Sequence, residues 1–364
     1  MNHAASDIED QRYMRRALAL AAAAPAAVSP NPGVGALVVA GGRVIGEGAT
    51  QIDGGPHAEV LALRSVAPAD RALLPEATVY VTLEPCSIYG RTPPCSTLLA
   101  ESRVARVVVG CLDFTAGVCG RGLEELRLAG VTVRVGVEQD RAFFTHRHRH
   151  VYVRERRPYV ILKQAVTADG VVGLKGERLR ITGPAANRES HAWRADVDAI
   201  LVGVGTVNAD DPSLTVRHAE GASPLRVVLD PDGRAAPASN VFTDGHPTLH
   251  VTCTPAKRTQ TRDGVHTLHV HRATLLPALM RHLHEARIGR LLVEGGPTTL
   301  RRFVDAGYYD EWREWRSPGL AAGGPRRSFA AATSPVPLSR AGAYGPDVLM
   351  RGYATDRIWS LKSP

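Results

Sequence analysis

A histidine, a glutamate and two cysteines stand close together early in the chain. His57 and Glu59 lie two residues apart in "PHAEV", and Cys86 and Cys95 follow in "LEPCSIYGRTPPC". One imidazole and two thiolates can hold a tetrahedral zinc ion with a fourth position open for water, which is typical of a catalytic zinc site. Such a cation lowers the pKa of water, and Glu59 is spaced to carry a proton from water to a leaving amine. The spacing predicts a zinc-dependent deaminase.

None of these residues alone would indicate a catalytic zinc site. A single cysteine is usually a small buried hydrophobe, and a structural zinc would need a fourth protein ligand. The four residues together, with a proline beside each cysteine, favour the catalytic site. Pro94 precedes Cys95 and indicates a helix start, where a thiol is favoured as the thiolate. The other cysteines lack such spacing and are expected to pack in the core: Cys111, Cys119 and Cys253.

The sequence around the ligands supplies elements that can position them. The strand "ATVYVTLEP" ends just before Cys86, the short helix "CSTLLAES" begins at Cys95, and "HAEVLALRSV" has helical periodicity. A helix over residues 7–24, a strand pair around a Gly-Gly turn, and the segments "ARVVVG", "GLEELRLAG" and "VTVRVGV" continue the alternation. Strands that alternate with helices predict a layered α/β domain.

The rest of the chain is expected to form a second α/β domain, since 364 residues exceed one ordinary core. The segment "THRHRHVYVRERRP", residues 145–158, can be interpreted as a metal or nucleic-acid patch, but a solvated inter-domain connection is favoured. We expect the zinc-dependent deaminase domain over 1–147, a linker over 148–158 and the second domain over 159–364. Within the last, residues 311–345 are expected to be irregular.

Composition limits the class of protein and its partners. Hydrophobic content of 44% is that of a globular protein, and no apolar run reaches the roughly 18 residues that cross a bilayer. Asp7, Glu9 and Asp10 precede the first apolar stretch, where an export signal needs positive charge. We therefore expect a cytoplasmic protein with no membrane partner. A net charge of +8 suits a phosphorylated substrate or cofactor; a nucleic-acid-binding or base-editing protein is the rival, disfavoured by 5% aromatic content.

Longer stretches resemble a known family. "PNPGVGALVV", "VTLEPCSIYGRTPPC" and "GRGLEELRLAGV" are similar to the deaminase half of the bifunctional riboflavin-biosynthesis deaminase/reductases. "LKQAVTADG", "AILVGVGTVNADDPSLTVR" and "LLVEGGPTTL" resemble their reductase half. The resemblance implies a cytidine-deaminase-like three-layer domain followed by a dihydrofolate-reductase-like α/β domain, in a homo-oligomer. It also implies zinc-dependent deamination of a phosphoribosylamino-diaminopyrimidinone, then NADPH-dependent reduction of the ribosyl group to ribityl.

Site residues carry over by motif match. The zinc ligands would be His57, Cys86 and Cys95, with Glu59 as the catalytic proton carrier. The expected substrate-binding residues are Asn31, Arg91, Arg194, Leu214, Arg217 and Glu294. The expected cofactor-binding residues are Ala165, Thr206, Asp210, Gly295 and Gly296. The two glycines would let the backbone approach the cofactor phosphate closely.

Several positions depart from the family pattern. The family usually has histidine at the positions of Thr50 and Ile88, and "DPNP" where this chain has "DFTAG", residues 113–117. An aliphatic side chain at 88 deprives a buried polar group of a partner, which costs about 1–3 kcal/mol. In the second half, Arg178 and Arg180 replace a small hydroxyl and an aromatic side chain. The unusual "EWREWRSP" places four charges where an apolar strand is expected, and unpaired buried charge is expensive: Glu311, Arg313, Glu314 and Arg316.

Two interpretations of these departures stay open. The new arginines recognise an altered anionic ligand, or the reductase domain is a folded module that no longer turns over. The riboflavin-pathway enzyme is the first prediction. The alternative is a paralogue that deaminates a related pyrimidine or purine in specialised metabolism, with an inactive or repurposed reductase domain.

Overall fold

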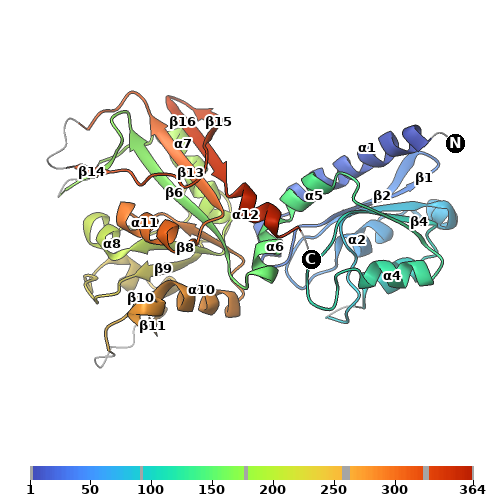
Figure 1. Cartoon of the computed structure of the whole chain (residues 1–364), viewed down its shortest axis with the longest axis horizontal. Coiled ribbons are helices and arrows are strands. Elements are labelled where there is room, and N and C mark those ends of the chain that lie inside the picture. Colours follow the sequence, from blue (N-terminus) through green and yellow to red (C-terminus); the bar gives the residue numbers. More distant parts are fainter. Residues whose placement is uncertain (1–2, 91–92, 176–178, 256–262, 323–327, 363–364) are drawn as a thin grey trace. The chain divides into compact units, whose positions relative to one another are not determined.

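The computed structural model describes residues 3–90, 93–175, 179–255, 263–322 and 328–362. The chain divides into two compact units. Unit 1 contains Met1–Glu155 and Leu361–Pro364, and unit 2 contains Arg156–Ser360. Each unit has its own sheet and its own helices (Figure 1).

Unit 1 is built on a five-stranded sheet in the order β2-β1-β3-β4-β5. Its strands are β1 (Gly35–Ala40), β2 (Arg43–Ala49), β3 (Thr78–Leu83), β4 (Arg106–Cys111) and β5 (Thr132–Val135). β1 runs antiparallel to β2 and β3, whereas β3, β4 and β5 are parallel. β1 is buried along its whole length, as expected for an apolar strand covered on both faces.

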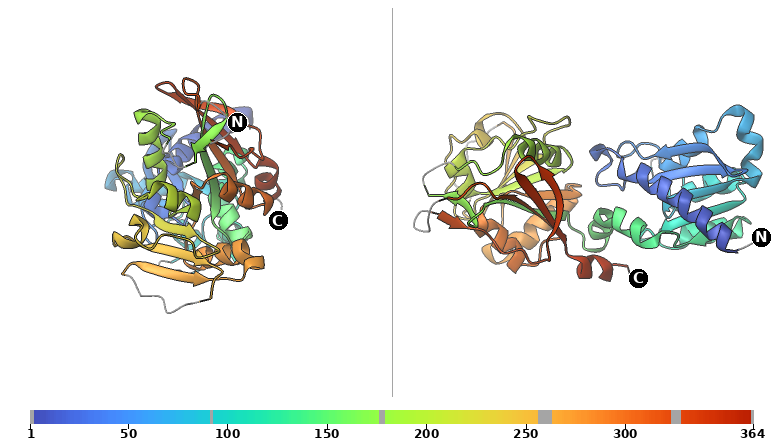
Figure 2. Two further views of the ribbon diagram at one scale, coloured as in Figure 1. Left: turned by 90° about the vertical axis from the view of Figure 1, so that its left-hand side faces the viewer. Right: turned by 90° about the horizontal axis from the view of Figure 1, so that it is seen from above.

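Helices cover both faces of this sheet, as the prediction of a three-layer domain required. α1 (His3–Ala22) and α5 (Gln139–Thr145) pack together on one face, and α2 (Ala58–Arg64), α3 (Cys95–Glu101) and α4 (Arg121–Leu128) lie on the other (Figures 1 and 2). Two 3-10 helices, η1 (Ala26–Val28) and η2 (Pro68–Glu76), complete the connections. The buried side of α1 follows helical periodicity: Tyr13, Met14, Ala17, Leu18 and Ala21.

The segment expected as a solvated linker contains a helix of unit 1. α6 (Arg147–Arg154) buries His150 and Val151, and the preceding His146 is buried as well. The His150 ring stacks on Phe143 with 4.3 Å between ring centroids. Burial lowers the pKa of His146 to about 4 and holds that of His150 well below its usual range. Both imidazoles are therefore neutral near pH 7 and pack like apolar rings, which the basic composition of the segment concealed.

Unit 2 contains a nine-stranded sheet in the order β11-β10-β9-β8-β12-β6-β13-β16-β15. The strands from β11 to β13 are parallel, and β16 and β15 continue the sheet antiparallel. In chain order they are β6 (Tyr159–Thr167), β8 (Ala199–Gly203), β9 (Leu225–Leu229), β10 (Thr248–Thr252), β11 (Val265–His269), β12 (Arg290–Val293), β13 (Glu311–Ser317), β15 (Ser339–Tyr344) and β16 (Asp347–Tyr353). β7 (Val171–Leu174) pairs separately with β14 (Ser328–Ala330).

The core of unit 2 lies between this sheet and two amphipathic helices. α10 (Leu275–Glu285) and α11 (Pro297–Asp305) pack apolar side chains such as Leu279 and Phe303 against β6, β8, β9 and β10. The remaining helices are η3 (Arg272–Thr274), α7 (Pro184–Ala195), α8 (Val204–Asp210), α9 (Asn240–Thr243) and α12 (Thr355–Ser360). The alternation of parallel strands with helices agrees with the predicted second α/β domain.

The expectation of an irregular segment over 311–345 is wrong for its described strands. β13, with the sequence EWREWRS, lies inside the sheet between β6 and β16. Its two tryptophans point to opposite faces: Trp312 joins the core, and Trp315 stacks on Trp193 of α7 at 5.2 Å. β14 and β15 occupy later parts of the same range.

The charges of β13 are tolerated because each is paired. Arg313 Nε donates to Glu311 at 2.7 Å, and Arg316 Nε donates to Glu314 at 2.7 Å. Glu314 also accepts from Gln164 Nε2 at 2.8 Å. A buried charge is costly only when it lacks a partner, so this strand stays in the sheet despite its composition.

Candidate functional site

Three elements of unit 1 bring the predicted zinc ligands together. His57 is the N-cap residue of α2, Cys95 is the first residue of α3, and Cys86 follows the end of β3. These are the positions that the sequence predicted for the two thiols, at a strand end and a helix start. The chain thus converges on one point from three separate segments.

The geometry of this cluster fits a zinc ion. His57 Nδ1 lies 3.5 Å from Cys86 Sγ and 3.3 Å from Cys95 Sγ. The three ligand atoms lie within 4.8 Å of one another. Zn–N and Zn–S bonds of usual length at a tetrahedral angle would separate nitrogen from sulfur by about 3.6 Å. The distances therefore match a ligand set that converges on one cation.

Hydrogen bonds within the cluster already favour a thiolate. The pKa of Cys86 is lowered to about 4, chiefly because Cys95 Sγ donates a hydrogen bond to it, with a further contribution from His57. The backbone N–H of Cys95 also donates to Cys86 Sγ at 3.3 Å. That hydrogen bond to Cys86, together with burial, raises the pKa of Cys95, and the hydrogen bond to Cys86 raises that of His57.

Glu59 lies in the first turn of α2, two residues after His57. Its side chain is buried, and burial raises its pKa to about 7, although the charge of His57 opposes the rise. The charges of His57 and Cys86 both act on this carboxylate. The carboxylate is therefore directly beside the ligand cluster.

A second buried glutamate shapes the loop beside the cluster. Glu84 Oε2 accepts hydrogen bonds from the backbone N–H groups of Gly120 at 3.1 Å and Asp113 at 3.4 Å. Burial raises the pKa of Glu84 to about 7. Ser87 Oγ donates to Gly117 O at 3.3 Å, so the unusual segment 113–117 lies against the residues that follow Cys86.

Of the positions that depart from the family pattern, Thr50 has a structural explanation. Thr50 is buried and accepts a hydrogen bond from Val34 N at 3.3 Å, so its hydroxyl is used inside the fold. Ile88 is 43% exposed and presents an apolar side chain on the loop between the cysteines. Asn31 Nδ2 donates to Asp53 Oδ1 at 2.7 Å, and no hydrogen bond among the described residues links it to the ligands. Arg91 lies outside the described residues.

In unit 2, the predicted Arg194 and Glu294 contact each other. Arg194 Nη2 and Nε donate to the Glu294 carboxylate at 2.9 and 3.1 Å, and Lys163 Nζ lies 3.7 Å from it. Burial alone would raise the pKa of Glu294, but the Arg194 and Lys163 charges lower it to about 2. Lys163 was not among the predicted site residues; a lone cation in the apolar strand "YVILKQAVT" was its signal.

The loop over residues 211–217 carries two further predicted residues. Leu214 is buried and has a positive φ of 57°, which a leucine adopts only when its surroundings impose it. Arg194 Nη1 donates to Thr215 O at 3.3 Å. Arg217 Nη1 donates to Thr215 Oγ1 at 3.1 Å, and Arg217 N donates to His191 Nδ1. Arg217 and Leu214 are thereby connected to the Arg194–Glu294 pair.

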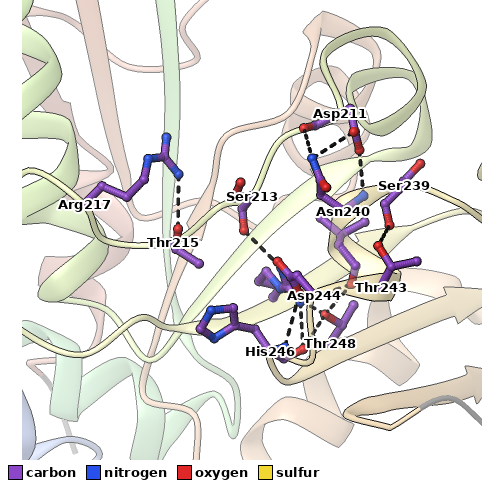
Figure 3. Close-up of polar contacts among 12 residues, drawn as sticks. Asp211, Ser213, Thr215, Arg217, Ser239, Asn240, Thr243, Asp244, His246 and Thr248 are labelled. Atoms are coloured by element: carbon purple, nitrogen blue, oxygen red, sulfur yellow. Dashed lines mark hydrogen bonds and ion pairs between the residues drawn. The ribbon is translucent and has the colours of Figure 1, made fainter.

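A buried arginine that the sequence analysis missed holds this loop. Arg226 of β9 donates from Nη1 to Ser213 O at 3.1 Å, and its guanidinium forms a two-pronged ion pair with Asp244 at 2.6 and 2.7 Å. Asn240 Nδ2 donates to the Asp211 carboxylate at the start of the loop (Figure 3). A charged residue inside "LRVVLD" was the available signal, but its partners lie elsewhere in the sequence.

Three of the predicted cofactor residues, Gly295, Gly296 and Thr206, lie at the start of α11. Gly296 is the N-cap residue of α11, and a Cβ there would lie 3.8 Å from Thr206 Oγ1. At Gly295 a Cβ would approach the Thr299 side chain to 2.6 Å, so glycine is required there by packing alone. Asp210 ends α8, and Ala165 lies on β6 two residues after Lys163. The described contacts do not bring Ala165 and Asp210 together. Of the two departing arginines, Arg180 is exposed and Arg178 lies outside the described residues.

Comparison with known proteins gives consistent matches over both units. The RibD C-terminal domain matches residues 158–349, and the cytidine and deoxycytidylate deaminase zinc-binding region matches residues 7–111. The riboflavin biosynthesis protein RibD of Aquifex aeolicus is 39% identical over 306 residues, which cover 83% of this chain and 85% of the relative. The Escherichia coli protein of the same name is 37% identical, with coverage of 86% and 89%.

Solved structures match over nearly the whole chain. A diaminohydroxyphosphoribosylaminopyrimidine deaminase/5-amino-6-(5-phosphoribosylamino)uracil reductase from Thermotoga maritima superposes with a TM-score of 0.84 at 32% identity, covering 96% of this chain and 99% of that one. RibD of Acinetobacter baumannii gives the same TM-score and identity, with coverage of 95% and 99%.

Proposed function

The chain belongs to the RibD family of riboflavin-biosynthesis proteins, and we propose which of its residues carry the two reactions. Unit 1 is a zinc-dependent deaminase and unit 2 is an NADPH-dependent reductase. The substrates are those named for the Thermotoga relative: a diaminohydroxyphosphoribosylaminopyrimidine is deaminated, and 5-amino-6-(5-phosphoribosylamino)uracil is reduced. The convergence of His57, Cys86 and Cys95 beside Glu59 is the observation that carries the deaminase assignment.

In the deaminase, the chain's own residues bind the metal and move the proton. His57 Nδ1 and the two thiolates would hold zinc, which lowers the pKa of water at its fourth position when bound. Glu59 accepts the proton of the attacking water and delivers it to the exocyclic amine. The water oxygen bonds to the ring carbon, the carbon–nitrogen bond breaks and ammonia leaves. Asn31 and Arg91 are proposed to bind the substrate.

In the reductase, we propose that the glycines at the start of α11 bind the cofactor and that the charged residues around Glu294 bind the substrate. The space that a Cβ at Gly296 would fill, at the N-terminus of α11 and facing Thr206, suits a phosphate of NADPH, which supplies a hydride when bound. Arg194, Glu294 and Arg217 are proposed to bind the substrate beside Lys163, where charged groups recognise phosphate and hydroxyls. When NADPH is bound, its hydride, together with one proton, would convert the ribosyl group to ribityl.

The comparisons give no support to a paralogue acting on another base. Both unit matches and the full-length structural matches point to the riboflavin-pathway enzyme, with both reactions present. The arginines of β13, which suggested a changed ligand, are engaged with glutamates of the same strand.

Two assays on the zinc-loaded full chain test the assignment. Ammonia should be released from the phosphoribosylamino-diaminopyrimidinone without NADPH. NADPH oxidation should then require the deaminated product. Failure of the first assay with zinc fully bound would refute the deaminase assignment, and failure of the second with authentic product would refute the reductase assignment.

The proposal also covers the cellular location, the partners and the oligomeric state of the protein. Among the described residues, the helices lack the length and apolar character that a bilayer span requires, and all five cysteines are free thiols. Free thiols and use of NADPH support a reducing, cytoplasmic location. We expect neither nucleic acid nor a membrane as partner. A homo-oligomer is expected, and light scattering of the purified protein measures its mass.

A further inference from the structure

Arg149 of α6 reaches from the supposed linker to the loop beside the metal cluster. Its Nη2 donates a 2.8 Å hydrogen bond to Thr115 Oγ1. Thr115 is itself fixed, because its hydroxyl donates to Asp113 Oδ1 at 2.6 Å and its backbone N–H donates to the same oxygen at 2.9 Å. The arginine therefore has a defined direction, set by a loop that is already ordered.

The charge of Arg149 lacks a counter-ion in the described part of unit 1. No carboxylate lies within 4.0 Å of its guanidinium there, and its Nε is buried without a hydrogen-bond partner. The residues of unit 1 outside the description contain no aspartate or glutamate. By contrast, the equally basic Arg106 and Arg134 both bind Asp10. The positive charge of a part-buried guanidinium is not balanced when its hydrogen-bond partner is a neutral hydroxyl. This arrangement indicates a binding site for an anion.

The location of this cation relates it to the deaminase site. The segment that carries Thr115 also contacts the residues after Cys86, through the hydrogen bond from Ser87 to Gly117. Arg149 is therefore linked, through Thr115 and Gly117, to the loop that follows Cys86. Arg149 thus stands near the ligand set without belonging to it. A substrate phosphate, separated from the reacting amine by the pyrimidine ring and the pentose, needs a cation in such a place.

We propose that Arg149 binds the phosphate of the deaminase substrate and so selects the phosphorylated pyrimidine over its dephosphorylated form. This inference rests on the proposed deaminase function. Thr115 and Asp113 act as positioning residues, since they orient the guanidinium. The basic helix α6 then has a role in substrate recognition.

The test compares ammonia release from the phosphorylated substrate and from the same compound without its phosphate. Arg149→Met should raise KM for the phosphorylated substrate by about ten- to a hundredfold, the usual effect of losing a charged hydrogen-bond partner. KM for the dephosphorylated compound should change by less than about twofold, because no phosphate contact is lost there. Arg149→Lys should recover part of the difference.

Arg147→Met is the matched control, since it removes the same charge from the same helix. Arg147 Nη1 donates to Phe144 O, and its guanidinium lies over the Phe144 ring. The Arg147→Met enzyme should show the same ratio of KM values for the phosphorylated and dephosphorylated compounds as the wild type. Equal losses on both substrates for Arg149→Met, or no loss on either, would overturn the proposal. If Arg149→Met does not fold, as judged by zinc content and thermal unfolding, Thr115→Val should give a smaller loss confined to the phosphorylated substrate.

A direct binding measurement separates this inference from the function on which it rests. If wild-type enzyme releases ammonia from neither compound, the deaminase assignment fails. Calorimetry with inorganic phosphate on the zinc-loaded full chain then decides the inference. Loss of one phosphate site in Arg149→Met but not in Arg147→Met supports it, and identical binding in both variants refutes it.

Discussion

Glu59 and the predicted zinc ligands illustrate how strongly the chemistry of a side chain depends on its place in this fold. The carboxylate is buried close to the ligand cluster, where the charges of His57 and Cys86 act on it. A buried carboxyl beside a metal site is suited to accept a proton and return it, because neither of its protonation states is strongly preferred near neutral pH.

We predict that Glu59→Gln abolishes most deamination without releasing zinc. The amide keeps the shape but cannot carry a proton, so the rate of ammonia release should fall by about 10²–10⁴-fold. Elemental analysis should still find one zinc per chain. Glu101→Gln, at the exposed end of α3, is the control and should leave both values unchanged. Full activity in Glu59→Gln would remove Glu59 from the mechanism.

The Glu294 ion pairs should make stability depend on acid pH. The pKa of Glu294 is about 2 in the folded chain, against about 4.3 when unfolded, so its ionised form stabilises the fold. This contribution is complete above the unfolded pKa and is lost as pH falls through the folded value. Glu294→Gln should therefore be less stable than wild type by about 3 kcal/mol at pH 7. Denaturant unfolding from pH 7 to pH 2 should show that the difference shrinks; a constant difference would contradict the assignment.

Among elements, the loop over 211–217 shows how a buried charge can fix a strained backbone. Arg226 binds Asp244 and three backbone carbonyls, including Ser213 O, and thereby holds the chain just before the positive-φ residue Leu214. Strain of this kind persists only when the surroundings impose it.

We predict that Arg226→Met lowers the stability of unit 2 by about 3–5 kcal/mol, because Asp244 and the carbonyls lose their partner. Reductase KM for the uracil substrate should rise, since the loop carries Arg217. Thermal unfolding and steady-state kinetics measure the two effects. The exposed Arg281 of α10 provides the control, and Arg281→Met should change neither. Unchanged unfolding of Arg226→Met would show that the ion pair contributes nothing.

Elements whose signals are local could be predicted from the sequence, and those that depend on distant partners could not. The three residues that lie together as a candidate metal site could be predicted, because Pro94, the strand end and the helix start lie within a few residues of Cys86 and Cys95. β13 was missed because the partners that tolerate its charges include Gln164, far away in the chain. α6 was missed because its histidines were counted as polar residues. That they are buried is evident only from neighbours such as Phe143, on which His150 stacks. Lys163 and Arg226 were missed for the same reason as β13.

For the whole molecule, the division into two units predicts that the two activities respond separately to metal. All three ligands belong to unit 1, and each unit has its own core. Removal of zinc by a chelator should therefore abolish ammonia release but leave NADPH oxidation with supplied deaminated product within about twofold of its starting rate. Added zinc should restore deamination. Parallel loss of both activities would show that the units depend on each other.

The grouping of Leu361–Pro364 with unit 1 means that the polypeptide leaves this unit after Glu155 and re-enters it after Ser360. The last turn contributes there, since Arg154 Nη1 donates to Leu361 O at 3.2 Å. In topological terms the reductase is an insertion in the deaminase chain. A deaminase fragment that ends at residue 155 would lack the C-terminal residues that belong to unit 1. To study unit 1 alone, these residues should be added as a peptide, or unit 2 should be replaced by a short linker that keeps them in the chain.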